Sequence, residues 1–201
     1  MSVTLVLTEH SGALTPETIA RYNTVRERLE SAAGTPVSTV RYEELESLEG
    51  ADAVVLSGSY APWAVHSTDA IDRLGEAVRG YGGPVLGICA GMQLQAKFAG
   101  GTIRHSPSPV QGVTTVEVLK QEGVLRGLPP RIGVYTHHSD EIEELPACFN
   151  VVARSASCAI EAIEDPARRW WGTQFHPEEF NAAHPAGERI LRNFFELSRA
   201  S

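Results

Sequence analysis

The sequence lacks the features that mark several common protein classes. It contains only three cysteines in 201 residues and no CxxC pair, which argues against a disulfide framework and against a zinc site. The apolar run at residues 3–7 has no basic flank and is too short for a signal peptide or a membrane span. We therefore expect a soluble protein of the reducing cytosol.

Positive charge and phosphate-binding loops are also scarce. The 17 Lys and Arg residues stand against 25 Asp and Glu residues, giving a formal net charge of −8. Nucleic acids and anionic membrane surfaces are therefore not expected partners. The sequence has neither a G-x-x-x-x-G-K loop nor a G-x-G-x-x-G pattern after a strand. We expect no bound cofactor.

The composition and the order of the local patterns predict the fold. Hydrophobic residues make up 42% of the chain, enough for a sizeable core, and we expect residues 1–201 to form one domain. The predicted strands of the first half are residues 3–7, 37–40, 53–56 and 84–86. The predicted helices between and after them are residues 15–34, 67–82 and 91–99. This alternation predicts an α/β, flavodoxin-like fold with a mostly parallel sheet between helices.

The second half has a different pattern. Its predicted strands are residues 113–119, 131–136, 150–155, 158–163 and 170–175. Turns separate them, so we expect antiparallel strands that extend or flank the first sheet. The predicted last helix carries Ile190, Leu191, Phe194 and Phe195 on one face. Residues 104–112 contain two prolines and two serines and are predicted to form a loop.

Cys89 lies between two glycines in the pentapeptide Gly-Ile-Cys-Ala-Gly, directly after a predicted strand. This arrangement is typical of a nucleophile elbow, in which a sharp turn exposes the central side chain. A helix that begins there would direct free N–H groups at the sulfur and favour the thiolate. A small buried hydrophobic residue is the alternative, since free cysteine is often buried. The pentapeptide alone leaves both interpretations open.

His176 is the best candidate for a base that would activate Cys89. It follows the predicted strand at residues 170–175, so it belongs at a strand end like Cys89. In an extended segment, residues two apart point the same way, which would place Glu178 against the imidazole. An ordinary turn with a solvated glutamate is the alternative. The presence of Cys89 in the same sequence favours a catalytic triad of Cys89, His176 and Glu178.

The remaining histidines have weaker patterns. His137 and His138 follow a predicted strand, but only Asp140 stands near them at a spacing suited to metal ligands. We therefore expect no metal site. The other histidines have polar neighbours and are predicted to lie at the surface: His10, His66, His105 and His184.

Together, the two motifs resemble those of class I glutamine amidotransferases. The nucleophile motif of that family, G-x-C-x-G-x-Q, occurs here at residues 87–93, and its base motif occurs at residues 175–178. The segments between them are similar in order and spacing to the glutaminase domains of GMP synthetases. The similar positions are residues 100–101, 136–140, 145–146, 149, 158 and 162–164.

The resemblance implies a chemistry for these residues. Cys89 would attack the side-chain amide of glutamine and form a thioester, His176 would pass a proton to the departing ammonia, and water would then release glutamate. Glu178 would orient the imidazole. The backbone N–H groups of Ala90 and Ser59 would form the oxyanion hole.

The resemblance also implies a substrate pocket, and it identifies one departure from the family pattern. Gly58, Gln93 and Ser139 would line the pocket. In the synthetase-linked families the oxyanion loop usually reads Ser-Gly-Gly-Pro, whereas residues 57–60 read Ser-Gly-Ser-Tyr. A serine resists the positive φ that the second glycine permits. The Gly-Ser version is similar to that of stand-alone relatives, including γ-glutamyl peptide hydrolases.

Three functions follow as alternatives. The chain has no phosphate loop, so an amidotransferase of this kind that spends ATP needs a synthetase on another polypeptide. We expect a glutaminase subunit that passes ammonia to such a partner. A stand-alone hydrolase of γ-glutamyl amides or peptides is the second possibility. The third is a non-catalytic regulatory subunit that retains the fold, which the presence of all three triad residues argues against.

Overall fold

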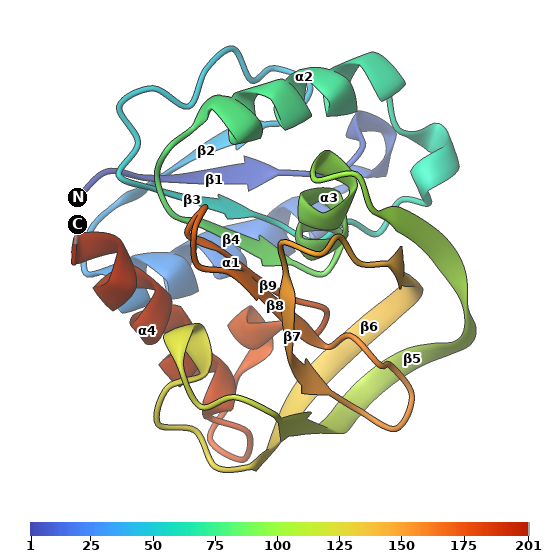
Figure 1. Ribbon diagram of the computed structural model, residues 1–201. Coiled ribbons are helices and arrows are strands. Elements are labelled where there is room, and N and C mark those ends of the chain that lie inside the picture. Colours follow the sequence, from blue (N-terminus) through green and yellow to red (C-terminus); the bar gives the residue numbers. More distant parts are fainter. Residues whose placement is uncertain (201) are drawn as a thin grey trace.

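The computed structural model describes residues 1–200, whose strands form one mixed nine-stranded sheet (Figure 1). The parallel part contains, in spatial order, β2 (Val37–Arg41), β1 (Val3–Leu7), β3 (Ala53–Leu56), β4 (Val85–Ile88) and β9 (Trp170–Thr173). The sheet continues through the antiparallel strands β8 (Ala162–Asp165), β7 (Asn150–Arg154), β5 (Thr102–Val118) and β6 (Arg131–Glu144). The prediction of a mostly parallel sheet with added antiparallel strands is confirmed.

Four α-helices cover the sheet in the described residues 1–200. They are α1 (Pro16–Ala33), α2 (Thr68–Gly80), α3 (Ala90–Phe98) and α4 (Ala186–Arg199). Short 3₁₀ turns complete the structure: η1 (Ser11–Ala13), η2 (Trp63–Val65), η3 (Gly123–Leu125) and η4 (Pro177–Glu179). Helix α1 begins as predicted, because the Thr15 hydroxyl accepts a hydrogen bond from the N–H of Thr18 at 3.2 Å. Within residues 1–200, no helix combines the length and apolar character needed to cross a membrane.

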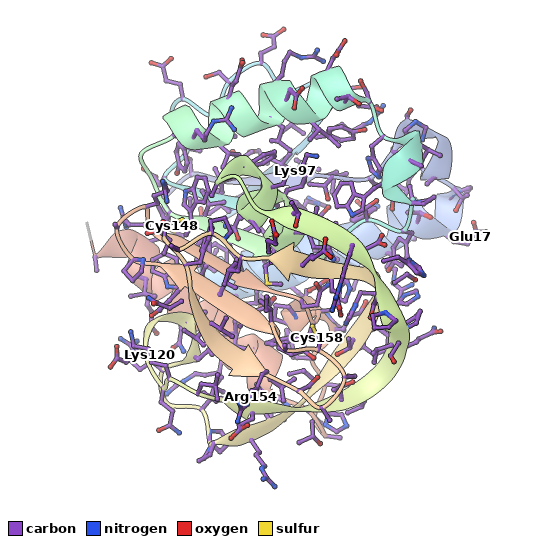
Figure 2. All side chains as sticks on the ribbon, turned by 45° about the vertical axis from the view of Figure 1, so that its right-hand side comes forward. Glu17, Lys97, Lys120, Cys148, Arg154 and Cys158 are labelled. Carbon is purple, nitrogen blue, oxygen red and sulfur yellow. The ribbon has the colours of Figure 1, made fainter. Side chains whose placement is uncertain are left out.

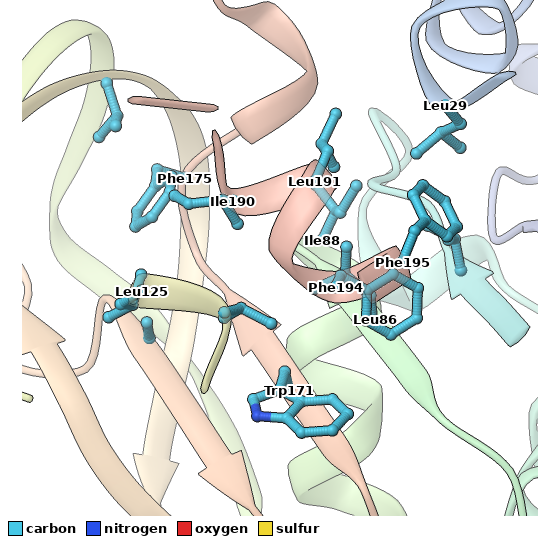
Figure 3. Close-up of a cluster of buried hydrophobic side chains, with 14 of the residues drawn as sticks. Leu29, Leu86, Ile88, Leu125, Trp171, Phe175, Ile190, Leu191, Phe194 and Phe195 are labelled. Atoms are coloured by element: carbon cyan, nitrogen blue, oxygen red, sulfur yellow. The ribbon is translucent and has the colours of Figure 1, made fainter. Parts of the chain in front are cut away.

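Two apolar clusters hold the helices against the sheet. Helices α1 and α4 pack on one face, where Phe194 and Phe195 of α4 join Leu86 and Ile88 of β4 (Figure 3). Helices α2 and α3 pack on the other face (Figure 1), where the second cluster includes Leu74, Val78 and Met92. Burial of side chains on both faces explains why the strands near the centre are apolar throughout.

Two predictions for the second half were wrong, and a third strand proved longer than predicted. Residues 104–112 belong to strand β5, and not to a loop. Their pairing with β6 is interrupted between His105 and Val110, where Pro107 and Pro109 supply no N–H for the sheet, but the chain stays extended. The strand predicted at residues 131–136 continues to Glu144, and the one predicted at residues 158–163 covers residues 162–165 instead.

The contact between α3 and β3 leaves no room for a side chain at Gly91. A Cβ there would lie 2.4 Å from the carbonyl oxygen of Leu56, so backbone would have to move. We expect Gly91→Ala to lower the free energy of unfolding by about 1–3 kcal/mol, as overpacking usually does. Gly80→Ala is the matched control, because nothing lies within 4 Å of its Cβ position. Urea unfolding measures both variants, and equal stabilities would contradict this account of the packing.

Candidate active site

The segments that follow β1, β3, β4 and β9 meet at one edge of the sheet, because the carboxyl ends of parallel strands lie together. The order β2-β1-β3 means that the chain changes its winding direction between β1 and β3, which opens a crevice at that edge. A cavity of ≈ 820 Å³ opens there. Among its lining residues are Ser59, Cys89, Ala90, Gln93 and Ser139.

Cys89 occupies the turn between β4 and α3. Its backbone has φ 51° and ψ −106°, a conformation that costs free energy for any residue other than glycine. Two hydrogen bonds hold this turn, from the N–H of Cys89 to the oxygen of Thr173 at 2.7 Å and from the N–H of Gln93 to the oxygen of Cys89 at 3.1 Å. The thiol is buried at the base of the cavity, and α3 begins at the next residue. These features are those of a nucleophile elbow.

His176 and Glu178 form a buried pair beside Cys89. The Nδ1 of His176 donates to Oε1 of Glu178 at 2.8 Å. The predicted contact is therefore present, but its geometric basis differs from the prediction, because residues 177–179 form the 3₁₀ turn η4 and not an extended strand. The main chain of the pair is fixed by two further contacts: His176 N–H donates to the oxygen of Tyr135, and the Arg28 guanidinium donates to the oxygen of Glu178.

The charge of the pair favours a protonated imidazole. Burial acts against the charged form, but the carboxylate of Glu178 and the nearby Cys89 sulfur outweigh it and raise the pKa of His176 well above its ordinary value. Nε2 of His176 has no hydrogen bond of standard geometry to the residues at 1–200. A ring nitrogen without a hydrogen bond can exchange a proton with a nearby thiol or ligand. A thiol, an imidazole and a carboxylate in this order can perform nucleophilic acyl transfer.

The two predicted oxyanion donors face the same cavity as Cys89. Ala90 is the first residue of α3, so its N–H has no acceptor in a preceding helical turn. Ser59 follows β3, and within residues 1–200 its N–H donates no hydrogen bond. Gly58 allows a close approach: a Cβ there would lie 3.0 Å from Cε1 of His176 and 3.5 Å from Cβ of Cys89. Both N–H groups can therefore donate to an anion in the cavity.

Two of the three predicted substrate residues, Gln93 and Ser139, line the cavity, whereas Gly58 is not among its lining residues. Gln93 lies on α3 and is held by the protein: its Nε2 donates to the oxygen of Asp140 at 2.7 Å, and its Oε1 accepts from Nε1 of Trp63 at 3.0 Å. The second lone pair of Oε1 has no donor in residues 1–200 and can accept a hydrogen bond from a ligand. Ser139 lies on β6 and is exposed at the cavity wall. Lys97 of α3, labelled in Figure 2, lines a more distant part of the cavity.

One of the surface histidines was predicted wrongly. His66 is buried, because its ring packs at 5.1 Å from the ring of Trp63 and bonds at 3.1 Å to the hydroxyl of Tyr42. Burial lowers the pKa of His66, as it does those of His137 and His138. Among residues 1–200, no three or more His, Cys, Asp or Glu side chains are placed to hold a metal ion.

Sequence reasoning missed two residues of the site. The amide of Gln174 donates from Nε2 to the sulfur of Cys89 at 3.5 Å. Glu9 lies just past β1, is fully buried and accepts hydrogen bonds from the loop that contains Ser59. The rule that drew attention to Cys89 applies to Glu9 as well, since a polar residue directly after a buried strand lies at the functional edge of such a sheet.

Comparison with known proteins gives consistent matches. Residues 19–197 match the family described as "Glutamine amidotransferase class-I". The chain is 34% identical over 160 residues to one subunit of the glutamine-hydrolysing GMP synthase of Pyrococcus abyssi, covering 80% of this chain and 82% of that protein. Identity to the equivalent subunit from Methanothrix thermoacetophila is 35% over 183 residues, covering 89% of this chain and 91% of that protein. A crystal structure of a protein described as a GMP synthase subunit from Thermoplasma acidophilum has a TM-score of 0.82 at 30% identity, covering 100% of this chain and 96% of that chain.

Proposed function

Because the chain belongs to the class-I glutamine amidotransferase family, we propose that it is the glutaminase subunit of an ammonia-using enzyme, with Cys89, His176 and Glu178 as its catalytic residues. It hydrolyses L-glutamine to glutamate and ammonia and passes the ammonia to a separate synthetase. One observation carries the proposal: a strained, buried cysteine and a buried His–Glu pair share the carboxyl edge of the parallel strands.

The residues suggest a two-step reaction. Cys89, as a thiolate, attacks the side-chain carbonyl carbon of glutamine, and the N–H groups of Ala90 and Ser59 bind the resulting oxyanion. The C–N bond breaks as His176 gives its proton to the leaving nitrogen, which leaves as ammonia. Water then attacks the thioester, gives a proton to His176 and releases glutamate and the thiolate. Glu178 keeps the imidazole in the required orientation and stabilises its charge.

The substrate residues are proposed from their place in the cavity. Glutamine enters with its side chain toward Cys89, passing the backbone of Gly58, where the lack of a side chain leaves room beside the imidazole. Its α-ammonium group faces the free lone pair of Gln93 Oε1 and the wall at Ser139. This arrangement binds the α-ammonium group of the substrate through neutral oxygen atoms.

The partner is inferred from the relatives. Two relatives whose lengths this chain nearly spans are each named as one subunit of a glutamine-hydrolysing GMP synthase, which implies at least one further subunit in those proteins. We propose that this chain also works beside a separate synthetase polypeptide, and that a GMP-forming synthetase is the first to be tested. We further propose that residues 1–201 act as one domain in the cytosol, in line with the continuous sheet and the unpaired cysteines.

The decisive experiment follows both products of L-glutamine labelled with ¹⁵N in the side-chain amide. The purified chain should release glutamate and labelled ammonia, and addition of the matching synthetase, its acceptor and ATP should move the label into the aminated product. Absence of glutamate with the synthetase present would contradict the proposal.

The pH dependence of glutamine hydrolysis should reflect the raised pKa of His176. The imidazolium that the reaction needs persists to a higher pH than for an ordinary histidine, because the folded-state pKa lies well above the usual value of 6.5. We therefore expect kcat/KM to fall on the alkaline side only well above pH 6.5. A pH–rate profile with purified chain measures this limb. A decline centred at or below that value would contradict the proposed ion pair.

The size of the cavity makes a second function, hydrolysis of γ-glutamyl amides or peptides without a partner, worth testing. At ≈ 820 Å³ it extends beyond Cys89 to Lys97 and Arg104, and the oxyanion loop carries Ser59 and Tyr60 instead of Gly and Pro. A stand-alone hydrolase of γ-glutamyl amides or peptides would use the same triad. A panel of γ-glutamyl peptides without any synthetase separates the two functions, since preference for a peptide over glutamine would favour the hydrolase.

A further inference from the structure

We propose that Glu9, together with Tyr22, is a positioning residue that fixes the oxyanion loop (residues 57–61) in the isolated chain, so that glutamine hydrolysis does not wait for the synthetase. The inference rests on the proposed glutaminase function. Glu9 lies outside the triad and touches neither the Cys89 sulfur nor the cavity. A bond to Glu9 also gives a role to Ser59, the serine that departs from the Gly-Gly-Pro pattern of the synthetase-linked families.

Glu9 is a buried carboxylate whose oxygens bind the oxyanion loop. It lies just past β1 with an exposed fraction of 0%. Its Oε1 accepts from the Ser59 hydroxyl at 2.8 Å and from the N–H of Ala61 at 3.1 Å, and its Oε2 accepts from the N–H of Tyr60 at 2.7 Å. The N–H of His10 also donates to Oε1, at 3.0 Å. A buried carboxylate satisfied in this way is a rigid anchor, because each lost bond leaves a desolvated donor.

Tyr22 of α1 and Thr8 hold the peptide that presents the oxyanion donor. The hydroxyl of Tyr22 donates its proton to the carbonyl oxygen of Gly58 at 2.9 Å and shares it with Oε2 of Glu9 at 3.1 Å. The Thr8 hydroxyl lies 3.1 Å from the same carbonyl oxygen. Since no described peptide bond is cis, the N–H of Ser59 points opposite to the Gly58 carbonyl. Fixing that carbonyl therefore fixes the donor.

The side chain of Ser59 adds a further hydrogen bond that holds the oxyanion loop in place. A Gly-Gly loop is free to rotate the intervening peptide, whereas Ser59 is tied by its hydroxyl to Glu9 and approaches Nε2 of His66 at 3.2 Å. Rotation of the Gly58–Ser59 peptide would break the bonds of Gly58 to Tyr22 and Thr8. The structure thus opposes the conformational change that would switch the oxyanion hole off.

The first test is Tyr22→Phe, which removes one oxygen and keeps the ring packed in the apolar cluster between α1 and the sheet. We expect kcat for glutamine to fall about 10-fold or more, up to the roughly 10²–10³-fold that loss of one oxyanion donor costs. KM should stay within about twofold, because the loop contacts the transition state more strongly than the ground state. Glu9→Gln should act in the same direction with a larger effect.

The rate at which iodoacetamide alkylates Cys89 distinguishes a general structural defect from loss of the oxyanion hole, because a structural defect would change this rate. This reaction needs the thiolate and access to it but no oxyanion hole. The folded chain is alkylated and then digested, and the rate at which the peptide containing Cys89 becomes modified should be unchanged in both variants. Glu164→Gln is the matched control, because Glu164 is also a buried carboxylate but bonds Lys120 at 2.7 Å, away from the loop. Its kcat should equal that of the unaltered chain. If Glu9→Gln fails to fold, Tyr22→Phe decides the question.

The outcomes separate this inference from the proposed function. Unchanged kcat in Tyr22→Phe and Glu9→Gln would overturn the inference, as would a fall in alkylation parallel to the fall in kcat. A chain that is inactive alone but active with the synthetase would also overturn it, while the glutaminase function would stand. A chain that is inactive in both conditions would remove the proposed function and the inference with it.

Discussion

Replacement of Cys89 by alanine is expected to reduce glutamine hydrolysis on the order of 10⁶-fold, the loss seen when the nucleophile of an acyl-transfer enzyme is removed. The reason is geometric as well as chemical. The other two thiols cannot replace it, because Cys148 is exposed outside the cavity and Cys158 is buried outside it, with a pKa that burial raises to about 12. The thiol of Cys89 is therefore the only cysteine sulfur that lines the cavity in residues 1–200.

The measurement is glutamate release at saturating glutamine, with circular dichroism and urea unfolding to verify the fold. Cys148→Ala serves as the matched control, since it removes a thiol from the surface and should retain full activity. Residual hydrolysis by Cys89→Ala at more than a small fraction of the normal rate, with an intact fold, would rule out Cys89 as the nucleophile.

Glu178→Gln is expected to lower kcat by roughly 10⁴-fold, as loss of the orienting carboxylate does in related triads. The amide keeps the shape of the side chain but removes the negative charge that raises the pKa of His176. It can also present its NH₂ group to Nδ1 and so favour the wrong tautomer. The alkaline limb of the pH–rate profile should therefore move to lower pH in this variant.

Glu179→Gln is a matched control in the neighbouring residue. Its carboxylate pairs with Arg21 at 3.4 Å and with Arg28 at 3.9 Å, and not with the imidazole. Partly exposed pairs of this kind contribute little to stability, so the variant should keep near-normal kcat. Equal losses in the two variants would mean that charge near this turn, and not the contact of Glu178 with His176, sets the rate.

The parts of the fold and site that local sequence determines were predicted well. Short apolar runs set the central strands, and helix caps such as Thr15 set where helices begin. Cys89 and His176 could be predicted to lie together because each follows an apolar strand, and the strand ends of a parallel sheet converge. The contact between His176 and Glu178 was anticipated because it spans only two residues.

The parts that depend on distant pairing were not predictable in the same way. Residues 104–112 look like a loop by composition, and they are extended because β6 pairs with them from a distant part of the chain, as for His105 opposite Asp140. The burial of His66 depends on Tyr42 and Trp63, which no local pattern connects. Glu9 reaches the oxyanion loop across a separation of 50 residues or more.

The most direct test of the account is to capture the covalent intermediate. The chain is mixed with L-glutamine, quenched in acid during turnover, digested and examined by mass spectrometry. We predict a γ-glutamyl group on the peptide that contains Cys89, and none on the peptides that contain Cys148 or Cys158. Turnover of glutamine with no γ-glutamyl group on Cys89, or with the group on another residue, would contradict the claim that this thiol is the nucleophile.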